Sequence, residues 1–192
     1  MVALTAKLSW YVARSSGMVT WALVTASILW GLMLSSRLIR RCGVPAWLLA
    51  LHRYLGTLSI VFVAVHLLAL VADNFVHFGW KDLFVPMATK WRPGPTAWGI
   101  AAFYLLIAIQ ITSCLMRRLP RKVWHTIHLS SFVLFVAGTL HGFQSGADRS
   151  NRLVQWAAVV GSVVIVTLLV FGLLHRSTLR QRARCSARSV PA

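Results

Sequence analysis

Residues 52–72 read HRYLGTLSIVFVAVHLLALVA, and this stretch decides the fold. Residues 54–72 contain no acidic or basic side chain other than that of His66. A membrane-spanning helix needs about 20 predominantly apolar residues to cross the hydrocarbon core. Because backbone polar groups find no water in lipid, such a stretch must be helical. Residues 54–72 therefore predict a transmembrane helix that carries a histidine inside the membrane.

Four further windows of the chain have the same apolar character. They cover residues 17–36, 96–116, 123–142 and 153–174. The composition agrees, because 58% of the 192 residues are hydrophobic and 12% are charged, whereas a typical soluble domain has roughly 25% charged residues. The mean hydropathy of +0.71 also points to lipid as the solvent. We predict an all-α integral membrane bundle of about five transmembrane helices within residues 17–176.

The net charge of +17 arises from 20 lysines and arginines against three acids. The basic residues form short clusters in alternate connecting segments, while Asp73, Asp82 and Asp148 lie in the other segments. Basic clusters of this kind are typical of cytoplasmic loops. The pattern predicts a multi-pass protein of the plasma membrane, with its N-terminus outside and its C-terminus in the cytoplasm. The scattering of the clusters argues against nucleic-acid binding, which requires a single basic surface.

The two ends of the chain lie outside the predicted bundle. Residues 1–16 are expected to form an N-terminal segment along the membrane surface. Residues 177–192 are basic and are expected to form a flexible cytoplasmic tail that is attracted to anionic lipid. The three cysteines, Cys42, Cys114 and Cys185, form neither CxxC nor CxxCH. Covalent attachment of a c-type haem and a thiolate zinc site are therefore unsupported.

Four of the seven histidines mark two of the predicted helices. His52 and His66 are 14 positions apart, which is about 3.9 turns and about 21 Å, so they share one helix face. His128 and His141 are 13 positions apart, or about 19.5 Å. Both helices run outward in the predicted topology. We therefore expect His52 to lie level with His128, and His66 level with His141.

Two histidine pairs at two depths are what two stacked haems with paired histidine ligands require. Neutral imidazole is a common axial ligand of haem iron. Thirteen positions make about 3.6 turns, which leaves His128 and His141 on different faces of a regular helix. A distortion at Gly138 or at the pair Ser130 and Ser131 would have to bring the two rings to one side.

Other interpretations of these residues stay open. A buried histidine can simply hydrogen-bond to a neighbouring helix. His125 lies three residues before His128 and could replace it as a ligand, although its depth matches less well. Gly138 and Gly142 flank His141 and leave room either for a flat macrocycle or for a closely packed helix.

Several polar residues near the predicted helix ends are secondary candidates. Arg53 follows His52 and is a candidate to pair with a haem propionate, although an arginine here can also reach the lipid headgroups. His77, Trp80 and Lys81 lie in the outer loop and are candidate contacts for a docking partner. His175 ends the last window, where a cation is favoured by the helix dipole.

The pattern His52-Arg53-x-x-Gly56, His66, Trp124-x-x-x-His128-Leu129 and His141 resembles the ferric reductase-like transmembrane domain family. This family includes the membrane cores of NADPH oxidases and ferric reductases, and the haem-binding subunit of methionine sulfoxide reductase. The resemblance covers roughly residues 20–176. It implies two b-type haems bound by His52, His66, His128 and His141, and electron transfer across the membrane.

The sequence contains no GxG dinucleotide fingerprint, so we expect it to lack the flavin and NADPH region of the larger relatives. A separate flavoprotein, a quinol or a diffusible flavin would then have to donate the electrons, and an extracytoplasmic partner would accept them. The main hypothesis is a ferric reductase-like component that passes electrons through two haems. The alternative is a single-haem or quinone-reactive anchor subunit of a separate reductase, such as methionine sulfoxide reductase. A non-redox scaffold is the third hypothesis, and no side chain is predicted to be catalytic.

Overall fold

The computed structural model describes residues 2–35, 46–73, 78–145 and 151–188, with side chains from residue 8 to residue 171 within these ranges. The described elements are all α-helices, as the sequence predicts. They are α1 (Val2–Ser35), α3 (Ala46–Val71), α4 (Trp80–Phe84), α5 (Pro93–Cys114), α6 (Arg121–Leu129), α7 (Ser131–Ser145) and α8 (Arg152–Arg188).

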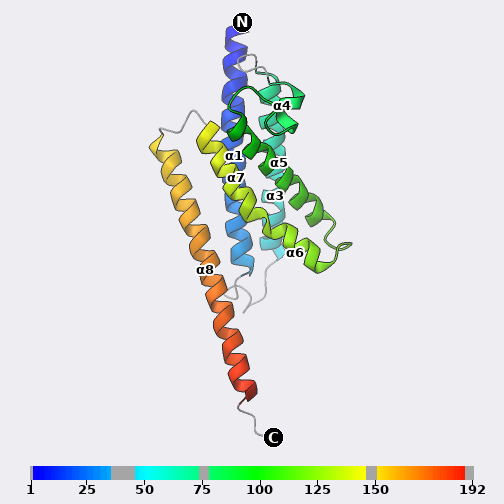
Figure 1. Cartoon of the computed structure of the whole chain (residues 1–192), viewed down its shortest axis with the longest axis vertical. Helices are drawn as coiled ribbons and strands as arrows, with labels where there is room; N and C mark the ends of the chain where they lie inside the picture. The colour runs from blue at the N-terminus through cyan, green and yellow to red at the C-terminus, as the bar shows by residue number, and fades with distance from the viewer. Residues whose placement is uncertain (1, 36–45, 74–77, 146–150, 189–192) are drawn as a thin grey trace.

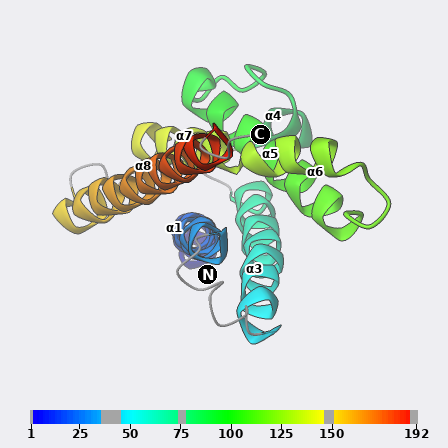
Figure 2. The same cartoon turned by 90° about the horizontal axis from the view of Figure 1, so that it is seen from below.

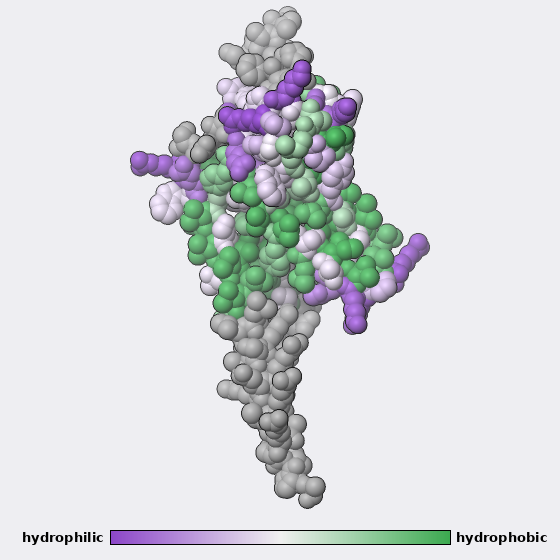
Figure 3. Space-filling view, viewed as in Figure 1, coloured by the Kyte–Doolittle hydropathy of each residue, from purple (hydrophilic) through white to green (hydrophobic). Residues whose placement is uncertain are grey.

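Five of these helical segments are long and apolar enough to cross a membrane, which confirms the predicted number of spans. They are Leu8–Ser35, Ala46–Val71, Pro93–Cys114, Arg121–Ser145 and Arg152–Phe171. On the face shown in Figure 3, apolar side chains cover the middle of the bundle, and the strongly hydrophilic side chains lie at the edges of this apolar region. This face of the bundle therefore presents a lipid-compatible band with polar rims.

The long helices form two pairs of neighbours in space. α3 packs along α1, and α7 packs along α5, while α8 makes its main contact with α1 at the side of the bundle (Figures 1 and 2). We call the end that carries α4 the α4 end, and the opposite end, which carries α6, the α6 end. α8 continues past the α6 end as a helix to Arg188 (Figure 1).

The buried core lies mainly between α1, α5 and α7. Its members are Val24, Ile28, Ala102, Leu106, Ile109, Leu134, Phe135, Ala137 and, from α8, Ile165. Trp21 of α1 ties α1 to α7, because its indole N–H donates to Thr139 Oγ1 at 3.0 Å and its ring lies 6.1 Å from that of Phe135. Lipid tails are as apolar as these side chains, so close packing and such hydrogen bonds hold the helices together.

Helix α1 extends well beyond the window that the sequence predicts. It runs without a break through residues 2–16. Ser9 Oγ donates to Asp73 Oδ1, two residues after the end of α3, at 3.3 Å, and the Ala13 carbonyl lies 2.7 Å from His66 Nδ1 of α3. This part of α1 therefore contacts α3, and its placement along a membrane surface stays a prediction. The predicted tail, residues 177–192, is helical as far as Arg188. Its flexibility also stays a prediction.

The connection between α3 and α5 folds back onto α5. The Tyr104 hydroxyl donates to the Phe84 carbonyl at 2.8 Å, and the rings of Phe84 and Phe103 lie 5.8 Å apart. Arg92 caps the start of α5 with a positive φ of 43°, and its Nη1 donates to the Gln144 carbonyl at 2.7 Å. The connection therefore fixes the α4 end of α5 against α7. His77 lies outside the described residues.

Candidate functional site

The structure brings together the two histidine pairs that the spacing predicts. The ring centres of His52 and His128 lie 6.0 Å apart, and those of His66 and His141 lie 6.4 Å apart. The ring planes are nearly perpendicular in both pairs, at 71° and 84°. The first pair lies toward the α6 end and the second toward the α4 end. Each pair joins one histidine of α3 to one histidine of the α6–α7 span.

The distortion that the 13-residue spacing requires lies at Ser130. Helix α6 ends at Leu129 and helix α7 begins at Ser131. The Ser130 N–H donates to the Ile127 carbonyl three residues back, at 3.1 Å, instead of continuing the regular four-residue pattern. Gly138, the other predicted place, lies inside an unbroken helix. The break at Ser130 lets His128 and His141 both face α3.

Two of the histidines donate to backbone carbonyls. His66 Nδ1 lies 2.7 Å from the Ala13 carbonyl of α1, and His141 Nδ1 lies 2.9 Å from the Pro95 carbonyl of α5. A carbonyl oxygen can only accept, so Nδ1 must carry the proton in both rings. The unprotonated Nε2 then keeps its lone pair. This tautomer is the one in which an imidazole binds a metal through Nε2.

The other two histidines make the equivalent contact to serine hydroxyls. His52 Nδ1 lies 3.3 Å from Ser27 Oγ of α1, and His128 Nδ1 lies 3.5 Å from Ser113 Oγ of α5. A hydroxyl can donate or accept, so these contacts fix the tautomer less firmly than the carbonyls do. All four rings nevertheless use Nδ1 for these contacts, and Nε2 is left available.

Glycines of α1 make room for the α3 histidines. A Cβ at Gly17 would lie 3.1 Å from His66 Nδ1, and a Cβ at Gly31 would lie 3.2 Å from His52 Cε1. Both distances are tighter than ordinary van der Waals contact. Gly17 and Gly31 are 14 positions apart, as the two histidines are. The sequence therefore carries a second 14-residue spacing, which is the signal that could have identified α1 as part of the site.

The α7 histidine has the closest glycine contact. A Cβ at Gly99 of α5 would lie 2.6 Å from His141 Nδ1. In contrast, a Cβ at Gly138 or Gly142 would meet no described protein atom within 4 Å. Gly99 therefore lets α5 approach His141, whereas Gly138 and Gly142 do not serve close packing among the described residues. Of the two interpretations of these glycines, the one that remains is that they leave room for a flat macrocycle.

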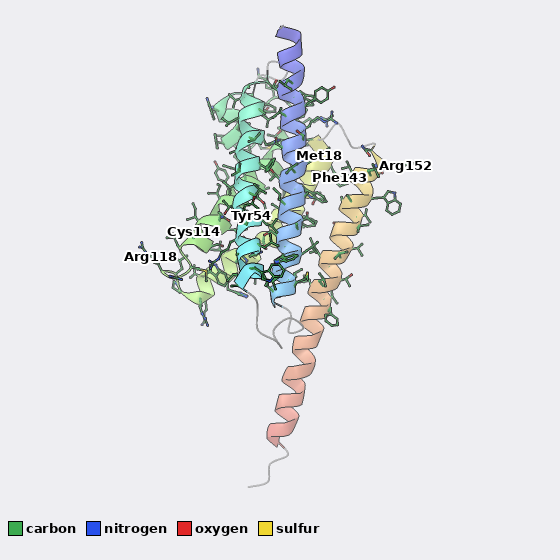
Figure 4. The ribbon with its side chains drawn as sticks, turned by 180° about the vertical axis from the view of Figure 1, so that it is seen from behind. Met18, Tyr54, Cys114, Arg118, Phe143 and Arg152 are labelled. Carbon is green, nitrogen blue, oxygen red and sulfur yellow. The ribbon has the colours of Figure 1, made fainter. Side chains whose placement is uncertain are left out.

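Two other candidates from the sequence, His125 and Arg53, lie close in sequence to the histidines of the first pair. His125 is exposed and lies edge-on to Trp124, so it does not replace His128 beside His52. Arg53 is exposed near the α6 end. The same end carries exposed Cys114 and Arg118 (Figure 4).

The paired rings fit a single metal ion between them. An imidazole nitrogen lies about 2 Å from a first-row metal such as zinc, and the ring centre lies roughly 1 Å further, so two rings on opposite sides of one metal have centres about 6 Å apart. The observed 6.0 and 6.4 Å match this spacing. Histidine is a common ligand of haem iron. The residues of each pair therefore fit a haem, which His52 with His128, or His66 with His141, would hold.

The sequence profile of one protein family, described as ferric reductase like transmembrane component, matches residues 16–139. Three related proteins are each named protein-methionine-sulfoxide reductase heme-binding subunit MsrQ. The one from Herminiimonas arsenicoxydans is 30% identical over 139 residues, which cover 69% of this chain and 59% of the relative. The one from Ralstonia nicotianae is 32% identical over 144 residues, which cover 73% and 61%. The one from Rhodospirillum rubrum is 31% identical over 124 residues, which cover 62% and 56%. The chain thus spans about three fifths of the length of these relatives, and no solved structure matches it.

The glycine contacts predict opposite effects of two alanine substitutions. Gly99→Ala should lower the unfolding temperature in detergent, because overpacking against His141 costs about 1–3 kcal/mol. Gly161→Ala on α8 is the control and should keep or raise that temperature, because its Cβ would lie at ordinary van der Waals distance, 3.4 Å from Thr25 Cγ2, and alanine favours a helix over glycine by about 1 kcal/mol. A Gly99→Ala protein as stable as Gly161→Ala would contradict the close contact of α5 with His141.

Proposed function

The chain belongs to the ferric reductase-like transmembrane component family, and on that premise we propose that it is the haem-binding membrane subunit of a separate reductase. The names of the three relatives make methionine sulfoxide reductase the best-supported partner. The subunit would take electrons from a flavoprotein or a quinol on one side of the membrane and deliver them to its partner on the other.

The two histidine pairs carry this proposal. We assign His52 and His128 as the axial ligands of one b-type haem, and His66 and His141 as those of a second. Haem supplies one-electron redox chemistry at its iron, and the protein supplies position and surroundings. The ring spacing in both pairs and the Nδ1 contacts of all four rings support two haems over a single one.

The neighbouring residues would hold these ligands in place. The Ala13 and Pro95 carbonyls keep His66 and His141 in the tautomer that presents Nε2, and such contacts also make the imidazole a stronger ligand. Gly138 leaves open space one turn before His141. We assign that space to the flat macrocycle. Arg53 is proposed to pair with a propionate near the α6 end.

The proposed orientation places the α4 end outside the cell and the α6 end in the cytoplasm. Its support is the cluster of exposed basic side chains at the α6 end, Arg117, Arg118, Arg121 and Lys122. The electron donor would then meet the α6 end. The exposed Trp80 and Lys81 of α4 are proposed contacts for the extracytoplasmic partner.

The haem content tests the proposal directly. Detergent-purified protein should contain about two b-type haems per chain in a pyridine haemochrome assay. His66→Ala and His128→Ala should each remove about one haem, because each breaks one pair. His125→Ala is the matched control and should retain both. Protein without haem after haem-replete expression would overturn the proposal, and one haem per chain would favour the single-haem anchor.

A larger side chain at Gly138 tests the assigned space. Gly138→Leu should lower the haem content by about one per chain, because the leucine side chain would fill the room beside His141. The haem at His52 and His128 should remain. The His66→Ala protein should hold only that haem, so its spectrum serves as the reference that identifies it. Full haem content in Gly138→Leu would show that the open space faces lipid instead.

The orientation is testable by thiol labelling of intact cells. The starting protein should have serine in place of its three cysteines, Cys42, Cys114 and Cys185. Lys81→Cys in that protein should react with a membrane-impermeant maleimide, whereas Arg118→Cys should react only after the cells are opened. The reverse pattern would place the α4 end in the cytoplasm.

A further inference from the structure

Trp124 lies against the histidine pair at the α6 end, but its indole N–H makes no hydrogen bond. It sits on α6, one turn before His128, and the two rings are stacked at 5.1 Å between centres and 22° between planes. Within the described residues, its Nε1 is the single buried side-chain nitrogen or oxygen that lacks a hydrogen-bond partner. Buried polar atoms are nearly always paired, so this exception requires an explanation.

Two indole groups of α1 have partners within the protein. Trp21 Nε1 donates to Thr139 Oγ1 at 3.0 Å, and Trp30 Nε1 donates to the Leu48 carbonyl at 3.1 Å. An indole N–H can only donate, so Trp124 requires an acceptor. The protein supplies acceptors to these two indoles, whereas no described residue supplies one to the indole beside His128. The acceptor for Trp124 is therefore expected to come from the molecule held at this site.

The charges around Trp124 favour an anionic acceptor. Arg121 and Lys122 precede Trp124 on α6 and are exposed, and Arg53 follows His52 on the facing helix α3. No described acidic side chain lies on α3 between His52 and Val71 or on α6. A carboxylate accepts strong hydrogen bonds from N–H donors and is attracted by nearby cations. A haem carries two such carboxylates, its propionates.

We propose that Trp124 Nε1 donates a hydrogen bond to a propionate of the haem held by His52 and His128. This inference rests on the proposed function and extends it by a propionate-binding residue that the histidine spacing does not reveal. Trp124 then serves the site twice. Its ring fixes the plane of His128 by stacking, and its N–H binds the edge of the macrocycle. With Arg53 on the facing helix, the haem edge is held from both sides of the site.

Trp124→Phe separates the two roles, because it keeps an aromatic ring and removes the N–H. In the haem-loaded protein, we expect Trp124→Phe to release one of its two haems to apomyoglobin about tenfold faster, while the other haem leaves at the original rate. The midpoint potential of the faster haem should also fall, because the propionate charge is no longer offset by the donor. Trp21→Phe is the matched control and should leave both the release rates and the potentials unchanged.

Reconstitution with haem dimethyl ester identifies the acceptor. The ester lacks the propionate charge and keeps only a weaker neutral acceptor, so most of the tenfold difference between native and Trp124→Phe proteins should disappear with it. A tenfold difference that persists with the ester would overturn the proposal and assign the effect to stacking on His128. Unchanged release and potential in Trp124→Phe would also overturn it. A native protein that holds no haem at this pair would instead contradict the proposed function itself.

Discussion

The structure depends on one constraint: in a hydrocarbon environment, each histidine ring must find its hydrogen-bond partner inside the bundle. His66 meets this requirement at the Ala13 carbonyl and His141 at the Pro95 carbonyl. Because the partner lies on the neighbouring helix in each case, the contact sets how far α1 is displaced along α3, and α5 along α7. The glycines one turn after these carbonyls, Gly17 and Gly99, then follow from the need for close approach.

Each pair of neighbouring helices therefore repeats the same arrangement. The first helix offers an acceptor and a glycine, and the second offers the histidine. Contacts within α1–α3 and within α5–α7 are extensive, whereas α3 and α5 touch little. The histidine pairs bridge the two units across about 6 Å. A group held between the rings would therefore connect units that are otherwise joined mainly through α1 and α7, at contacts such as Trp21 with Thr139.

The sequence predicts the spans, the pairing of His52 with His128 and of His66 with His141, and a distortion near Ser130. These features depend on helix length and residue spacing alone. The sequence does not predict that the first helix continues unbroken before residue 17, because Arg14 interrupts the apolar pattern. Nor does it predict Ala13 as the partner of His66. Every residue carries a carbonyl, so only the register of α1 against α3 selects that one. Trp124 is part of the sequence pattern, but residue spacing does not show that its indole N–H is buried without an acceptor, because this depends on how the side chains pack.

The tautomers argue against histidines that merely join helices. A histidine used as an interhelical hydrogen bond needs only Nδ1, and all four rings already have that contact. None of the described hydrogen bonds uses Nε2. A joining role would leave Nε2 of each ring unused, in a low-dielectric bundle where an unpaired polar group is costly. A role as paired ligands uses all four Nε2 atoms, accounts for the ring spacing at both levels, and explains why glycine stands where a larger residue would displace the rings.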